Sequence, residues 1–174
     1  MIHEKGYIHV YTGPGKGKTT AALGLALRAM GAGFNVHMIQ FMKGRRYSEL
    51  ESIKNLSNFS ISQYGRDEFV KKEKPEKIDI DLAQKGLAHA KEIIKSEKYD
   101  MIILDEINVA VDYNLIVLAD VLNLIKEKPK NLELVLTGRY AHHEIVKNAD
   151  YVTEMLEIKH PYRDGVEARK GIEH

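Results

Sequence analysis

The sequence contains no cysteine and no tryptophan, and only four prolines among its 174 residues. Without cysteine there is no disulfide, no thiolate-bound zinc and no catalytic thiol, so a reducing compartment is compatible with the chain. No stretch approaches the roughly 20 consecutive apolar residues of a membrane-spanning helix. The first residues, MIHEK, lack the apolar centre of a signal peptide. We therefore expect a cytoplasmic protein without a membrane partner.

An excess of charge of either sign is also missing. The 26 basic and 25 acidic residues leave a formal net charge of +1. Domains that bind nucleic acid usually carry a strong excess of positive charge, so we expect no nucleic-acid partner. The length suits one domain with a substantial core and is short for two. We expect a single domain over residues 1–174.

Residues 12–20, TGPGKGKTT, are typical of a loop that binds phosphate groups. Glycines at alternate positions let backbone N–H groups approach an anion, a lysine adds a positive charge, and the Thr19 hydroxyl is placed to bind Mg²⁺. A strand-like segment precedes the loop and an Ala/Leu-rich helix follows, so the helix N-terminus would point at the phosphates. The residues expected to bind a nucleoside triphosphate here are Gly13, Pro14, Gly15, Lys16, Gly17, Lys18, Thr19 and Thr20.

This loop is shorter than the common pattern, which has four residues between the first glycine and the Gly-Lys pair. Only three residues separate Gly13 from Gly17, and Pro14 removes one N–H group. A dinucleotide-binding pattern fails, because it needs glycine where Lys18 stands. We expect a tight loop with an unusual grip on the polyphosphate.

Strand-like segments alternate with helical patterns, which predicts an α/β fold: a mostly parallel central sheet with helices on both faces. A helix capped by Asp79 or Asp81 is expected after a mobile polar loop at residues 65–78. Its buried stripe is Ala83, Leu87, Ala90 and Ile94. The expected strands are residues 7–12, 34–41, 61–64, 101–104, 132–136 and 151–158, and the other helices are 20–30, 50–56, 118–125 and 142–147.

Ligands of parallel sheets bind at the carboxyl ends of the strands, where this sequence places polar residues. The apolar segment 101–104 ends at Asp105 and Glu106. A carboxylate at this point supports Mg²⁺ directly or through water, so we expect Thr19, Asp105 and Glu106 around the metal. Glu106 is equally suited to polarise an attacking water. Both acids also fit the simpler interpretation of a helix cap beside a solvated side chain.

Basic residues follow two other strands of the expected sheet. Arg139 could neutralise a polyphosphate, as could the cluster of Lys43, Arg45 and Arg46, for which solvation at the surface is the better interpretation. Arg28 lies ten residues beyond the loop lysine. It reaches the nucleotide or pairs with an acid on the surface.

Several segments, taken together and in order, resemble the ATP:corrinoid adenosyltransferases of the P-loop type. This resemblance implies a P-loop NTPase (RecA-like) fold, and it spans nearly the whole chain. The segments are TGPGKGKTTAA at 12–22, QFMKG at 40–44, LDE at 104–106, LTGR at 136–139, ADYVTEM at 149–155, KHP at 159–161 and GVEARKGI at 165–172.

The resemblance implies that ATP lies reversed in the loop, with its γ-phosphate deepest and its C5′ exposed. A Co(I) corrinoid, either cobalamin or a precursor, then attacks C5′ and triphosphate leaves, giving adenosylcobalamin or an adenosylcobinamide-type product. Lys18 would hold the γ end and Arg28 would contact phosphate. Thr19 and Glu106, with or without Asp105, would hold Mg²⁺. The resemblance also implies a homodimer and an external electron donor, a reduced flavin or flavoprotein.

Family members use an aromatic pair before the long middle helix to displace the lower corrinoid ligand, which makes Co(II) easier to reduce. Phe69 corresponds to one member of the pair, whereas the second, a tryptophan, has no counterpart and Lys71 lies near its position. Phe69 or Tyr64 would then act alone, unless Phe69 is an ordinary loop anchor. The segment 159–174 would close the corrinoid site, or form a frayed tail.

Two other functions remain compatible with the residues alone, because a phosphate-binding loop does not decide which bond of the nucleotide breaks. One is a P-loop ATPase or small-molecule kinase that cleaves the γ-phosphate, with Glu106 orienting the nucleophile. The other is a non-catalytic module that binds ATP and delivers a corrinoid to a partner enzyme.

Overall fold

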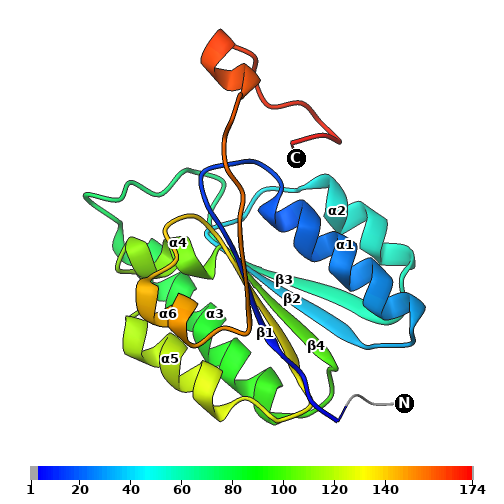
Figure 1. Cartoon of the computed structure of the whole chain (residues 1–174). Helices are drawn as coiled ribbons and strands as arrows, with labels where there is room; N and C mark the ends of the chain where they lie inside the picture. Colours follow the sequence, from blue (N-terminus) through cyan, green and yellow to red (C-terminus); the bar gives the residue numbers. More distant parts are fainter. Residues whose placement is uncertain (1–3, 174) are drawn as a thin grey trace.

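Six parallel strands form one sheet in the computed structural model, which describes residues 4–173 (Figure 1). The strand order is β3-β2-β4-β5-β1-β6, so the first strand lies near one edge and β4 in the interior. This arrangement confirms the predicted parallel α/β fold. The strands are β1 (Ile8–Thr12), β2 (Val36–Phe41), β3 (Phe59–Tyr64), β4 (Met101–Asp105), β5 (Glu133–Thr137) and β6 (Tyr151–Glu154).

Helices cover both faces of the sheet (Figure 1). One face carries α1 (Lys18–Gly31), with α2 (Ser48–Ser52) and the 3-10 turn η1 (Ile53–Asn55) beside it. The other face carries α3 (Lys77–Lys95), α4 (Ile107–Asp112), α5 (Leu118–Glu127) and α6 (His143–Lys147).

Strand β4 shows how the sheet is fixed between these layers. Met101 and Ile103 pack toward α1, whereas Ile102 and Leu104 pack toward α3, as the alternation of side chains along a strand requires. All four are buried, and each contributes about 1.5–3 kcal/mol by leaving water. A strand held on both faces is a rigid support for the residue at its carboxyl end, Asp105.

Helix α3 begins differently from the prediction. Its N-cap is Glu76, whose side chain accepts from the helix backbone, while the Asp79 side chain accepts from the Glu76 N–H over 2.9 Å. The prediction that Asp79 or Asp81 is the cap is therefore wrong, because Asp79 is instead the third helical residue of a capping box. The predicted stripe of Ala83, Leu87, Ala90 and Ile94 is buried throughout.

The largest differences from the expected elements concern α4 and β6. Helix α4 starts directly after β4 and was not predicted, and β6 ends at Glu154 instead of residue 158. Beyond β6 the chain leaves the sheet, forms the turn η2 (Pro161–Asp164) and comes back until Glu173 pairs with Lys16 of the loop (Figure 1). The last residue of the predicted closing segment, His174, lies outside the described residues. Within residues 4–173, no helix has both the length and the apolar composition needed to cross a bilayer.

Candidate active site

The glycine-rich loop between β1 and α1 wraps around the side chain of Lys18. Gly17, in the left-handed region at φ 110°, is the N-cap of α1, and Lys18 is the first residue of that helix. The Lys18 ammonium donates to the carbonyl oxygens of Gly13 over 2.8 Å and Gly15 over 2.6 Å. Burial lowers the pKa of Lys18, an effect that nearby Glu106 opposes. The loop therefore holds one positive charge in its centre.

Two of the loop glycines are needed for a reason other than the predicted approach to an anion. A Cβ on Gly13 or Gly15 would lie 2.5 or 2.7 Å from the backbone oxygen of Met155, just beyond β6. The Gly15 N–H donates to that same oxygen over 2.6 Å. These glycines let the segment after β6 pack against the loop, which fixes the loop from outside.

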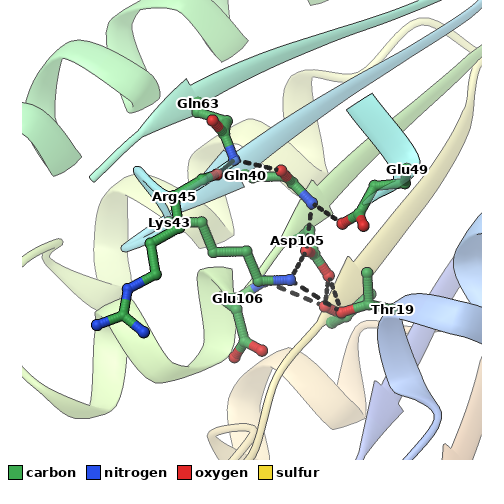
Figure 2. Close-up of polar contacts among 9 residues, drawn as sticks. Thr19, Gln40, Lys43, Arg45, Glu49, Gln63, Asp105 and Glu106 are labelled. Carbon is green, nitrogen blue, oxygen red and sulfur yellow. Dashed lines mark hydrogen bonds and ion pairs between the residues drawn. The ribbon is translucent and has the colours of Figure 1, made fainter. Parts of the chain in front are cut away.

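Asp105, at the end of β4, accepts hydrogen bonds from four protein donors (Figure 2). Its Oδ1 accepts from the hydroxyls of Thr19 over 2.9 Å and Thr137 over 2.7 Å. Its Oδ2 accepts from the Gln40 amide over 3.3 Å and the Lys43 ammonium over 2.7 Å. The side chain is fully buried. Asp105 thus ties the phosphate loop to strands β2 and β5.

Glu106 behaves differently from its neighbour. Its backbone is left-handed at φ 63°, and its carboxylate points away from the Asp105 cluster (Figure 2). Among the described residues, nothing forms a hydrogen bond or ion pair with this carboxylate. Burial raises the pKa of Glu106, and the charge of Asp105 raises it further. The Glu106 carboxylate therefore remains available to a ligand in the cleft.

The three members of the basic cluster separate in the structure. Lys43 lies in the site, where burial works to lower its pKa, but the ion pair with Asp105 outweighs this and the pKa is raised. Arg45 donates to a backbone carbonyl over 2.6 Å, and Arg46 pairs with Glu51 on the surface. Solvation is therefore the correct interpretation for Arg46 and the wrong one for Lys43.

A cleft of about 560 Å³ opens above these groups. Its lining combines the phosphate loop and charged residues with apolar and aromatic residues from the loops after β2 and β3, from α4 and from the C-terminal segment. The polar members are Gly15, Lys16, Gly17, Lys18, Thr19, Thr20, Lys43, Glu106, Arg139 and Glu173, and the apolar and aromatic members are Met42, Tyr47, Phe69, Val70, Val109, Tyr113 and Ile172.

Most of the predicted site residues line this cleft, but a few do not. Gly13 is buried within the loop, and Pro14 is exposed to solvent. Arg28 is exposed in the last turn of α1, and ten residues of helix place it about 15 Å from Lys18. The structure thus does not bring Arg28 to the cleft. Asp105 lies beneath Thr19, outside the lining.

Sequence reasoning missed Val109 and Tyr113, because their helix α4 was not predicted. It included Gln40 and Thr137 only within the segments that carry the resemblance, without a role. The sheet register carries the missing signal, since Gln40 is the partner of Asp105 in the β2–β4 pairing. Side chains at paired positions of neighbouring parallel strands lie close together, so the pairing places Gln40 beside Asp105 at the carboxyl ends of β2 and β4.

The oxygen atoms of Thr19 and Glu106 suit a magnesium ion that would also bind the phosphates of a nucleotide. Mg²⁺ usually takes one or two oxygen ligands from the protein and the rest from phosphate and water. Thr19 and Glu106 both face the cleft, whereas the four donors to Asp105 occupy both of its oxygens. Over residues 4–173 there is no group of three or more His, Cys, Asp or Glu side chains that could hold a metal alone.

A parallel sheet, a glycine-rich loop leading into α1 and a carboxylate at the end of β4 define a nucleotide-binding protein of the P-loop class. A solved structure of a KaiC-like protein from Pyrococcus horikoshii OT3 shares this fold, with a TM-score of 0.57 over 87% of this chain and 73% of that one, at 18% identity. The family model described as ATP:corrinoid adenosyltransferase BtuR/CobO/CobP matches residues 4–174. The chain belongs to this family.

Curated relatives agree with the family model. A corrinoid adenosyltransferase from Sinorhizobium sp is 40% identical over 173 residues, which cover 98% of this chain and 81% of the relative. The corrinoid adenosyltransferase CobA of Salmonella typhimurium is 34% identical over 177 residues, covering 98% of this chain and 87% of the relative. The similarity therefore extends over the phosphate loop, the acids after β4 and the C-terminal segment alike.

Proposed function

We propose that this protein transfers the 5′-deoxyadenosyl group of ATP to the Co(I) centre of a corrinoid, forming adenosylcobalamin or an adenosylcobinamide-type product. Family membership supports this activity. The observation that carries it is the mixed lining of the cleft, which brings a phosphate-binding loop and apolar and aromatic residues together around one cavity. Such a lining suits a polyphosphate together with a large, flat second substrate.

In this reaction the electron pair of Co(I) forms the bond to C5′, and the C5′–O5′ bond breaks with its electrons leaving on triphosphate. The protein orients ATP and neutralises the leaving group. Lys18, Lys16 and Arg139 supply positive charge around the phosphates. Thr19 and Glu106 would hold Mg²⁺, which supplies further charge neutralisation when bound. Asp105 positions Thr19 through its 2.9 Å hydrogen bond.

The cleft lining gives further support to attack by the substrate itself. The described residues that line it include no serine, cysteine or histidine. A Co(I) nucleophile needs no general base, so this lining suffices for adenosyl transfer. The ATPase or kinase alternative depends on Glu106 as base, and membership in the adenosyltransferase family does not favour it.

Phe69 is proposed to contact the lower face of the corrinoid. Its ring is 84% exposed at the cleft, which argues against a buried loop anchor, and the Arg45 guanidinium stacks on it at 5.1 Å. It also borders a second cavity of about 600 Å³ that contains Lys71. Tyr64 instead packs beside the core and pairs with His89. A homodimer, a cytoplasmic location and a reduced flavin or flavoprotein as electron donor stay predictions.

The test is an anaerobic incubation with Mg-ATP and chemically reduced Co(I) cobalamin, followed by the corrinoid spectrum and phosphorus NMR together. We expect a light-sensitive alkylcobalamin and intact triphosphate. ADP and phosphate with an unchanged corrinoid would indicate the ATPase or kinase instead. Bound ATP and corrinoid without either product would indicate a delivery module. Full transfer by a Lys18→Ala variant would contradict the assignment of the phosphate loop.

A further inference from the structure

The ammonium group of Lys43 lies against both oxygen-bearing side chains at the foot of the phosphate loop. Its Nζ is 2.7 Å from Asp105 Oδ2 and 3.2 Å from Thr19 Oγ1 (Figure 2). The Thr19 hydroxyl gives its own proton to Asp105, so Lys43 donates to the lone pairs of that oxygen. These lone pairs are also the ones that a divalent cation on Thr19 needs. Lys43 therefore holds a positive charge at the position that a metal ion bound to Thr19 would take.

The backbone that carries Lys43 is closely packed. A Cβ on Gly65 would lie 2.2 Å from the Lys43 amide nitrogen, and one on Gly44 would lie 2.5 Å from the Gly65 oxygen. The Met42 N–H also donates to the Tyr64 carbonyl over 3.0 Å. Backbones that approach this closely pack the loops after β2 and β3 tightly against each other. We therefore expect movement of the charge to come from the side chain.

That side chain has a second place to go without a change in the backbone. Lys43 lines the cleft together with Tyr47, whose ring centre is 5.2 Å from the ammonium. A turn about the side-chain bonds carries the charge from Asp105 into the cleft, toward the expected position of the phosphates. When the charge leaves, Asp105 keeps the three hydrogen bonds from Thr19, Thr137 and Gln40.

We propose that Lys43 is an internal cation that exchanges places with the metal. Without nucleotide it neutralises Asp105 and repels divalent ions from Thr19, since like charges a few ångströms apart repel strongly. When Mg-ATP binds, the ion takes Thr19 and Lys43 turns to the triphosphate. The proposal rests on the proposed function only in placing a metal-bound nucleotide in the cleft. The exchange allows the protein to bind Mg-ATP while it excludes free metal ions from Thr19.

The exchange predicts opposite effects of one substitution on two ligands. Lys43→Met removes the charged amino group and keeps most of the side-chain length. Without nucleotide, we expect this variant to bind Mn²⁺ at least about tenfold more tightly than the original protein, because Asp105 and Thr19 become open to the ion. We expect it to bind Mg-ATP about tenfold more weakly, because a phosphate contact is lost. Electron paramagnetic resonance measures the free Mn²⁺, and calorimetry measures nucleotide binding.

Matched controls separate this exchange from a general change of charge. Lys77→Met removes the same charge at a side chain that is 87% exposed, and we expect no change in either affinity. Adding Asp105→Asn to Lys43→Met is expected to abolish the gain in Mn²⁺ affinity. Unchanged or weaker Mn²⁺ binding by a folded Lys43→Met variant would overturn the proposal. Because this measurement uses no corrinoid, a failure of adenosyl transfer would not affect it.

A second test measures the original protein, and a variant serves only to assign the signal. In protein with isotope-labelled lysine, the NMR signal of the Lys43 ammonium is assigned by its loss in Lys43→Arg. We expect this signal to shift when Mg-ATP is added, because the group exchanges Asp105 for phosphate. A Lys43 signal that stays unchanged on saturation with Mg-ATP would overturn the exchange.

Discussion

The hydroxyl of Thr137 donates a 2.7 Å hydrogen bond to the buried carboxylate of Asp105. The same hydroxyl accepts the backbone N–H of Glu106 over 3.1 Å. The Thr137 side chain, at the end of β5, therefore fixes both acids at the end of β4. It gives Asp105 a hydrogen-bond donor, and it holds the left-handed turn that directs Glu106 into the cleft.

Thr137→Val tests this double role, because valine keeps the shape and removes the hydroxyl. We expect the free energy of unfolding to fall by about 1–3 kcal/mol, since two buried groups lose a partner. Urea denaturation measures this loss. The exposed Thr153→Val on β6 is the control and should change stability by less than about 0.5 kcal/mol. Equal stabilities of the two variants would show that the Thr137 hydroxyl has no such role.

Glu106→Gln distinguishes a metal ligand from a general base. The glutamine keeps the size of the side chain and loses its negative charge, so we expect Mg²⁺ to bind more weakly and adenosyl transfer to fall about tenfold or more at limiting Mg²⁺. Raising the Mg²⁺ concentration should restore much of the rate. The rate of transfer is measured as a function of Mg²⁺. Loss that no concentration of Mg²⁺ restores would contradict the assignment of Glu106 to the metal.

Phe69→Ala should affect reduction and leave alkylation alone. The ring is almost fully exposed, so we expect stability to change by no more than about 0.5 kcal/mol. Transfer that starts from Co(II) and a flavin reductant should fall about tenfold or more, because the proposed displacement of the lower ligand by Phe69 would be lost, while transfer from pre-reduced Co(I) should persist. The two assays are run side by side, with Tyr64→Phe as control. Equal losses in both would mean that Phe69 serves corrinoid binding in general.

The sequence was sufficient for the parallel sheet because strand-like segments alternate with helical ones, and because β4, buried on both faces, is a continuous apolar segment up to Asp105. It was insufficient for the short helix α4, which begins without a side-chain cap at a left-handed residue, Glu106. The local sequence pattern does not indicate such a helix start. The surrounding sheet and the Thr137 hydroxyl fix it instead.

The same limit applies to the site. The phosphate loop and Asp105 follow from spacing, because adjacent residues in the sequence form them. The role of Lys43 does not, since it depends on a contact with Asp105 across 62 positions of sequence. The basic segment after β2 gave no means of separating Lys43 from Arg46. Lys43 enters the site because the loops after β2 and β3 approach each other closely at Gly44 and Gly65.

His37 makes the stability of the fold depend on pH, away from the cleft. Its side chain on β2 is buried, accepts or donates one hydrogen bond with Ser60 over 2.7 Å, and its Nε2 has no partner within residues 4–173. The His89 ring lies 5.2 Å away, centre to centre. Burial lowers the pKa of His37 to about 4 from an ordinary value of 6.5, and His89 adds to this shift.

Below pH 6.5, the unfolded chain binds a proton at His37 that the folded chain does not bind until about pH 4. The free energy of unfolding should therefore fall as the pH drops through this range, by up to roughly 3 kcal/mol from this group. His37→Gln removes the titration, so its stability should depend less steeply on pH than that of the original protein. His143→Gln, at a side chain that is 79% exposed, should leave the steeper dependence intact. Urea denaturation across this pH range measures the difference. Parallel curves for His37→Gln and the original protein would show that His37 has the same pKa in the folded and unfolded chains.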